Sequence, residues 1–104
     1  MKGNKMDIKA LIEKMLLAGF KETTYQGQSD HFITKKTTIG EMPGLAEQMA
    51  DDLDVDEGSE VFVELILSTN KIQVFIPDAQ YVENDIEPFS ENGKEVLTMA
   101  GVVL

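Results

Sequence analysis

Two segments, residues 61–67 and 72–76, limit the fold more than any other feature, because aliphatic side chains recur at every second position along both. A period of two places those side chains on one face of a strand. Thr69-Asn70 lies between the segments and predicts a two-residue turn. In this register the pairs on one face are Leu67 with Ile72, Leu65 with Val74 and Val63 with Ile76. The pairs on the other face are Ile66 with Gln73 and Glu64 with Phe75. The sequence therefore predicts an antiparallel hairpin with one aliphatic face, as in a half-buried sheet.

Residues 7–18 have the pattern of an amphipathic helix that begins at Asp7, a good N-cap, and stops before Gly19. Its apolar side chains form one stripe at helical spacing, namely Ile8, Leu11, Ile12, Met15 and Leu16. Residues 20–25 and 31–37 contain β-formers and are joined by a polar link with a glycine, so they predict a second hairpin.

The other elements are shorter. Residues 45–53 have a short helical face, formed by Leu45, Ala46, Met49, Ala50 and Leu53. Residues 51–60 are expected to be an acidic loop, and residues 78–90 an acidic connection with one helical turn at its start. Ser90 is expected to cap a last helix that ends before Gly101.

Together these patterns predict an α+β fold in a single domain over residues 1–104. The domain is expected to contain an antiparallel sheet of about four strands, arranged as two hairpins. That sheet would pack against the N-terminal helix and one or two further short helices. Residues 1–6 precede the first periodic segment and are expected to form a flexible N-terminal extension.

The chain lacks arginine, cysteine and tryptophan, and His31 is its one histidine. The missing cysteine excludes disulfides, thiol nucleophiles and thiolate metal sites. His31 follows Ser29 and Asp30, but a catalytic triad requires convergence in space rather than adjacency in sequence. We therefore expect a protein that is not an enzyme and that carries no cofactor.

The formal net charge is −10, and fifteen of the nineteen acidic residues lie in residues 41–104. Such a charge favours association with basic partners. We therefore expect a small acidic protein-interaction module, an accessory or inhibitor protein that presents an acidic face to a basic partner; a nucleic-acid mimic is the sharpest form of this idea. The acidic face is expected from Asp51, Asp52, Asp54, Asp56, Glu57 and Glu60.

Two alternatives from other functional classes stay open. The alternating acids Asp52, Asp54 and Asp56 could make an ion-binding module. A calcium loop of the EF-hand type that starts at Asp52 would need glycine at its sixth position and glutamate at its twelfth, where the chain has Glu57 and Val63. We therefore expect no metal site. A small-ligand-binding or hydrolase-like domain could instead work with paired carboxylates, although no pair stands out in the sequence.

Direct binding to nucleic acid is not expected, because an acidic chain repels phosphate groups. Without arginine, it also has no side chain that can bind a phosphate through two parallel hydrogen bonds. No apolar run approaches the ~18 residues that a membrane span requires, so no membrane partner is expected. The absence of cysteine and of a secretory leader favours a cytoplasmic protein.

A homodimer is a further expectation. Three apolar side chains, Phe62, Ile66 and Phe75, remain on the second face of the 61–76 hairpin, and the chain ends in an apolar tail. Leftover apolar patches commonly mark an interface, and twofold pairing is the most frequent arrangement. The expected interface is Phe62, Ile66, Phe75, Val102, Val103 and Leu104.

Residues 45–77 resemble the AbrB-type swapped-hairpin modules of transcription regulators and antitoxins. The resemblance rests on a short helix, the turn Asp56-Glu57-Gly58-Ser59-Glu60-Val61 and a hairpin that ends in Ile72-x-Val74. Members of that family bind DNA through basic residues, often arginines, and this chain has no arginine. The resemblance therefore implies a hairpin module without its DNA-binding activity.

Overall fold

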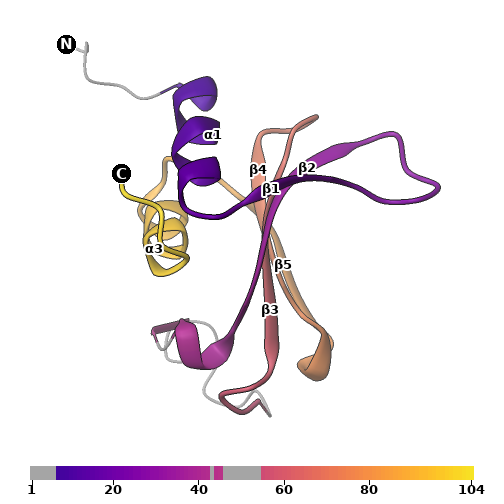
Figure 1. Ribbon diagram of the computed structural model, residues 1–104, viewed down its shortest axis with the longest axis vertical. Helices are drawn as coiled ribbons and strands as arrows, with labels where there is room; N and C mark the ends of the chain where they lie inside the picture. Colours follow the sequence, from indigo (N-terminus) through magenta and orange to yellow (C-terminus); the bar gives the residue numbers. More distant parts are fainter. Residues whose placement is uncertain (1–6, 43, 46–54) are drawn as a thin grey trace.

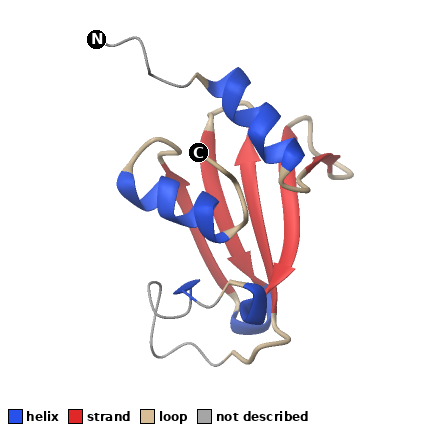
Figure 2. Cartoon of the chain, turned by 60° about the vertical axis from the view of Figure 1, so that its left-hand side comes forward, coloured by secondary structure: helices blue, strands red, loops and turns tan. Residues whose placement is uncertain are grey.

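The computed structural model describes residues 7–42, 44–45 and 55–104. The expected α+β fold is confirmed, with an antiparallel sheet of five strands in chain order. The strands are β1 (Lys21–Thr24), β2 (His31–Thr38), β3 (Glu60–Ile66), β4 (Lys71–Ile76) and β5 (Tyr81–Ile86). The helices α1 (Ile8–Leu17) and α3 (Glu91–Met99) lie on the same side of the sheet (Figures 1 and 2). The sheet therefore has one face covered by described helices and one face that they leave open.

The core lies between the sheet and the two helices. Alternate strand residues point toward the helices and are 0–3% exposed, namely Ile33, Val61, Val63, Leu65, Ile72, Val74 and Ile76. Leu11 and Met15 of α1 and Val96 and Leu97 of α3 complete this core, and each is fully buried. The period of two in the strands and the stripe in α1 thus meet in one apolar layer.

The register predicted for the central hairpin is wrong by two residues. Leu65 pairs with Ile72 rather than with Val74, because the connection is a four-residue loop and not the two-residue turn at Thr69-Asn70. A two-residue turn of the favoured hairpin type needs a positive φ at both central residues, which a β-branched threonine resists. Asn70 alone adopts it, with φ of 58°, and its N–H donates to the Ile66 carbonyl at 2.7 Å.

This shift of two residues leaves every side chain on the face that was predicted for it. It changes the partners on the open face, where Glu64 pairs with Gln73 and Phe62 pairs with Phe75. The pairing of Leu67 with Ile72 is also wrong, since Leu67 lies in the loop.

The sheet has one strand more than predicted. Residues 78–90 were expected to be a connection, but β5 occupies residues 81–86 after a 3-10 helix, η2 (Pro77–Ala79). The alternation of β5 is interrupted at Asp85, whose φ is 62°, and the register with β4 shifts between Ile72 and Val74. This edge strand contains a bulge and three acidic or amide residues, so its alternation of apolar and polar residues is too weak to identify it as a strand from the sequence.

The two helices begin and end where the sequence predicted. The Asp7 carboxylate accepts from the backbone N–H of Ala10 at 2.8 Å, and the Ser90 hydroxyl accepts from that of Gly93 at 3.0 Å. The glycines that follow α1 and α3 have nearly equal positive φ angles, 98° at Gly19 and 97° at Gly101. Each helix therefore ends in a left-handed glycine, which lets the chain turn back toward the core.

The helix predicted over residues 45–53 falls outside the described residues except for Leu45, which is fully buried. The flexible extension predicted for residues 1–6 also lies outside them. In the described part of this region, the 3-10 helix η1 (Ile39–Glu41) and Met42 follow β2, and both Ile39 and Met42 belong to the core.

Lys35 joins the ends of both helices. Its side chain lies on the covered face of β2, and Nζ donates to the carbonyl of Ala18 at 2.9 Å and to that of Ala100 at 2.7 Å. The carbonyl end of a helix carries a partial negative charge, so two such ends repel each other unless a cation lies between them. The Lys35 ammonium supplies that cation and holds α1 and α3 at fixed positions over the sheet.

We expect Lys35→Met to lower the free energy of unfolding by about 2–3 kcal/mol, because two charge-assisted hydrogen bonds are lost and two helix ends are left facing each other. Lys36→Met is the matched control. Lys36 is the next residue, is 61% exposed, and forms only a surface ion pair with Glu60, so its replacement should cost less than ~1 kcal/mol. Equal losses in urea denaturation would contradict the role given to Lys35.

Candidate functional site

A polar row crosses the open face of the sheet. The registers place Thr34, Glu64 and Gln73 side by side on β2, β3 and β4. Apolar residues flank this row on both sides along the strands. Phe62, Phe75 and Val82 lie on one side, and Phe32 and Ile66 lie on the other.

Glu64 is the centre of this row and is only 4% exposed. Its carboxylate accepts hydrogen bonds from the Thr34 hydroxyl at 3.0 Å, from the Gln73 amide at 3.2 Å and from the Tyr25 hydroxyl. All three donors are neutral. They satisfy part of the hydrogen-bonding capacity of the carboxylate, but none of them compensates its charge.

Of the three lysines on the open face, two are paired with other carboxylates, and the third, Lys21, lies on β1 opposite Thr34 and forms no ion pair with Glu64. Lys36 forms an ion pair with Glu60 at 3.1 Å, and Lys71 forms one with Glu87. Nδ1 of His31 lies 3.0 Å from Oε2 of Glu22, so none of the three close contacts between basic and acidic side chains of the described residues includes Glu64. Buried charges in proteins are usually paired with an opposite charge, and within the described part of the chain Glu64 departs from that rule.

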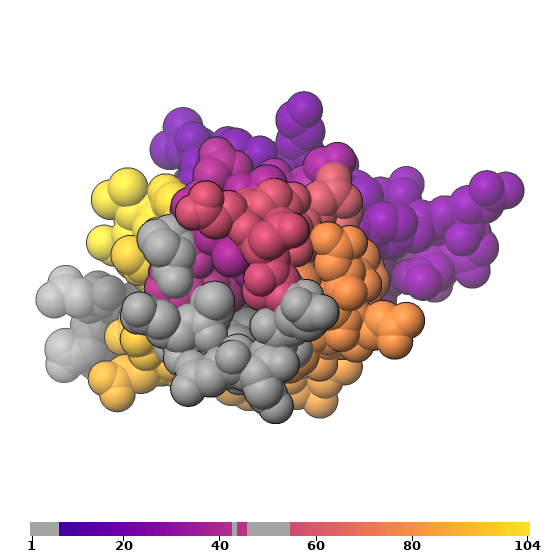
Figure 3. All heavy atoms as spheres, turned by 90° about the horizontal axis from the view of Figure 1, so that it is seen from below, coloured from indigo at the N-terminus to yellow at the C-terminus, as the bar shows by residue number. Residues whose placement is uncertain are grey.

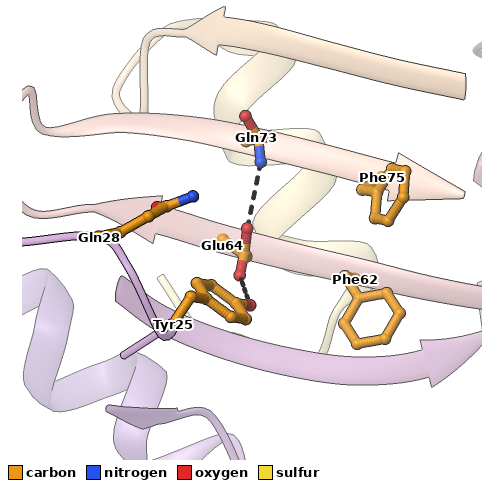
Figure 4. Close-up of a pocket in the computed structure, with 6 residues that line it drawn as sticks. All are labelled: Tyr25, Gln28, Phe62, Glu64, Gln73 and Phe75. Carbon is orange, nitrogen blue, oxygen red and sulfur yellow. Dashed lines mark hydrogen bonds between the residues drawn. The ribbon is translucent and has the colours of Figure 1, made fainter. Parts of the chain in front are cut away.

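A hollow of about 310 Å³ lies above Glu64 (Figure 4). Glu64 forms its floor, with Tyr25 and Gln28 toward one end and Phe62 and Phe75 toward the other. The rings of Phe62 and Phe75 are 6.1 Å apart between centroids. The hollow therefore combines one carboxylate with aromatic walls.

Tyr25 reaches the hollow from the loop between β1 and β2. Its ring packs edge-on against Phe32, with 5.0 Å between the centroids. The same loop projects from the body of the molecule on the side away from α1 and α3 (Figures 1 and 3). Partial burial raises the pKa of the Tyr25 hydroxyl above its ordinary value, and the hydrogen bond to Glu64 and the charge of that carboxylate raise it further.

The acidic residues predicted as a binding face have other roles where the structure describes them. The Asp56 carboxylate accepts from the backbone N–H of Gly58 at 2.9 Å and so closes its own turn. Glu57 is exposed, and its backbone carbonyl accepts from Gly40 at 2.9 Å. Glu60 lies on the open face beside Lys36. Asp51, Asp52 and Asp54 fall outside the described residues.

The residues predicted for a dimer interface divide between two sides of the sheet. Phe62, Ile66 and Phe75 are half-buried on the open face. Val102 is 2% exposed and belongs to the core on the covered side. Val103 and Leu104 follow it there and are 79% and 42% exposed. One continuous interface cannot use both groups, and the homodimer itself stays a prediction.

Sequence reasoning missed the site around Glu64. The register error placed Glu64 opposite Phe75 and so hid the contact with Gln73. Tyr25 and Thr34 belong to segments 39 and 30 residues away in the chain, and no local pattern connects them to Glu64. The available signal was a single carboxylate within the apolar run of β3.

Comparison with protein family models, curated proteins and solved structures finds no match to the chain. The resemblance of residues 45–77 to AbrB-type modules therefore gains no support. None of the helices in the described ranges is long and apolar enough to cross a membrane. The same ranges hold no group of three or more side chains placed to bind a metal ion, and Asp52 and Asp54 lie outside them.

We expect Tyr25 to ionise above the ordinary tyrosine pKa of 10.0. Since the unfolded chain releases this proton at lower pH than the folded chain, the folded state should lose stability as the pH rises above 10. Spectrophotometric titration of a Tyr81→Phe variant isolates Tyr25, because Tyr25 and Tyr81 are the two tyrosines of the chain.

Adding Glu64→Gln to that variant should lower the pKa of Tyr25 part of the way toward 10, since burial remains after the carboxylate charge is removed. An unchanged pKa would contradict the hydrogen bond between Tyr25 and Glu64.

Proposed function

We propose that this protein is a non-enzymatic protein-interaction module, an accessory or inhibitor protein whose open sheet face binds a basic segment of a partner. A lysine or arginine side chain of the partner would enter the hollow above Glu64. The observation that carries this proposal is a carboxylate that is 4% exposed and receives only neutral donors from the described residues. A cation from a partner would supply the missing opposite charge.

The carboxylate retains room for one more donor. A carboxylate offers about four lone-pair sites. Oε2 of Glu64 accepts from Tyr25 and Thr34, and Oε1 accepts from Gln73 alone. An incoming N–H group can therefore bind Oε1 without displacing any of the three donors, and the face needs no rearrangement to receive it.

The charge of the whole chain supports the same partner. A net charge of −10 attracts a basic segment and accelerates its encounter with the protein. A second copy of the chain would bring another −10 and, if the two open faces met, a second buried Glu64. The open face is therefore better suited to a basic partner than to self-association.

The edges of the sheet are less suited to binding than its face. The edge strand β1 has only four residues. The other edge strand, β5, bears Glu83 and Asp85 and bends at Asp85, where φ is 62°. Short, charged and bulged edges resist pairing with a further strand.

The hollow is also poorly equipped for catalysis. Hydrolysis by carboxylates needs two acids within reach of one substrate bond. Glu64 is the one carboxylate among the six residues that line the hollow, the others being tyrosine, phenylalanine and glutamine. This composition supports binding over the hydrolase-like alternative.

Titration calorimetry tests the proposal with a lysine-rich octapeptide whose N-terminus is acetylated and whose lysine side chains are left charged. Glu64→Gln keeps the shape of the side chain and removes its charge, and it should weaken binding by about tenfold, the equivalent of ~1.4 kcal/mol. Glu95→Gln is the matched control, because Glu95 is an exposed residue of α3 on the covered side. It changes the net charge equally and should alter the dissociation constant less than ~2-fold.

Equal weakening by both variants would mean that the peptide responds only to the overall charge, and it would contradict a site at Glu64. A circular dichroism spectrum identical to that of the parent protein confirms that each variant is folded.

A further inference from the structure

We infer that the hollow above Glu64 selects an alkylated ammonium group, with the dimethylated side chain of a lysine as the best match. This inference rests on the proposed function, because it specifies which basic group enters the same hollow. It follows from three properties of the hollow: the number of free carboxylate acceptors, the aromatic walls and the access from solvent.

The number of free carboxylate acceptors favours a cation with few N–H groups. Oε1 of Glu64 has one lone pair left after the bond from Gln73. An unmodified lysine brings three N–H donors and an arginine brings five, but Oε1 of Glu64 is the one free charged acceptor of the lining, and the other oxygens there belong to the neutral side chains of Tyr25, Gln28 and Gln73. A dimethylated ammonium brings one N–H donor, which matches the single free position on Oε1.

The aromatic walls favour methyl groups around the cation. Tyr25 lies toward one end of the hollow and Phe62 and Phe75 toward the other, with Glu64 between them (Figure 4). Methyl groups can pack against these rings while the positive charge is attracted by the ring faces. Recognition of alkylated ammonium ions by aromatic side chains uses this combination of apolar contact and charge.

Access and size are compatible with such a group. The hollow measures about 310 Å³ and is partly open rather than enclosed. An unmodified ammonium is a strongly hydrated point charge and keeps its water more readily than a methylated one. Methylation therefore lowers the cost of leaving water and adds contacts to Tyr25, Phe62 and Phe75.

A series of five acetylated amino-acid amides tests the inference: lysine, its mono-, di- and trimethylated forms, and a neutral isostere in which carbon replaces the trimethylated nitrogen. Binding to the full chain is followed by NMR chemical shifts and by the fluorescence of Tyr25 in the Tyr81→Phe background. We expect the dimethylated form to bind at least about fivefold more tightly than unmodified lysine. The trimethylated form should bind more tightly than its neutral isostere.

Two variants separate the contributions. Phe75→Leu keeps an apolar side chain and removes a ring, so it should reduce the preference for the dimethylated form; Phe62→Leu provides the same test if the first variant fails to fold. Glu64→Gln should weaken every charged member of the series and leave the isostere unchanged.

Failure of this inference is distinguishable from failure of the proposed function. If unmodified lysine binds as tightly as the dimethylated form, and Glu64→Gln weakens both, the preference for methylation is wrong and the proposed function stands. If the isostere binds as tightly as the trimethylated form, the charge has no role and the inference is overturned. If no charged member depends on Glu64, both proposals are overturned.

Discussion

The Lys35 ammonium is the contact that fixes the layout of this protein. It binds the terminal carbonyls of α1 and α3 at 2.9 and 2.7 Å, so two helices that are distant in the chain end at one point above β2. Both helices then bury their apolar faces on the same side of the sheet. The described part of the chain provides no third helix for the opposite side, and that side keeps phenylalanine side chains half-buried. A one-sided core thus produces an open face as its direct consequence.

On that face the arrangement around Glu64 departs from what stability alone would select. A buried carboxylate costs solvation free energy, and neutral hydrogen bonds recover only part of it. An apolar residue between Phe62 and Ile66 would extend the apolar surface without that cost. Departures of this kind are typical of binding sites, where a side chain is kept for its partner rather than for the fold. The charged, bulged edge strand β5 is consistent with recognition through the face.

The sequence predicts the parts of this fold that depend on local patterns. The ends of both helices follow from Asp7, Ser90 and the glycines after each helix, and the covered face of β3 and β4 follows from a period of two. The register of that hairpin depends on the backbone of Thr69 and Asn70, and β5 depends on pairing with β4, so neither is visible in a local pattern. The hollow could not be predicted, because it depends on contacts between segments up to 39 residues apart, which only the folded chain brings together.

The most direct test of the central claim is the free energy of unfolding of Glu64→Gln, measured by urea denaturation in the absence of any partner. The amide keeps an oxygen for Tyr25 and Thr34, and its NH₂ group can pair with a reoriented Gln73 amide. If Glu64 is retained to bind a cation, removing its charge should leave the stability unchanged within ~1 kcal/mol or increase it. A loss greater than ~2 kcal/mol would show that the carboxylate serves the fold itself, and it would contradict a site kept for a partner.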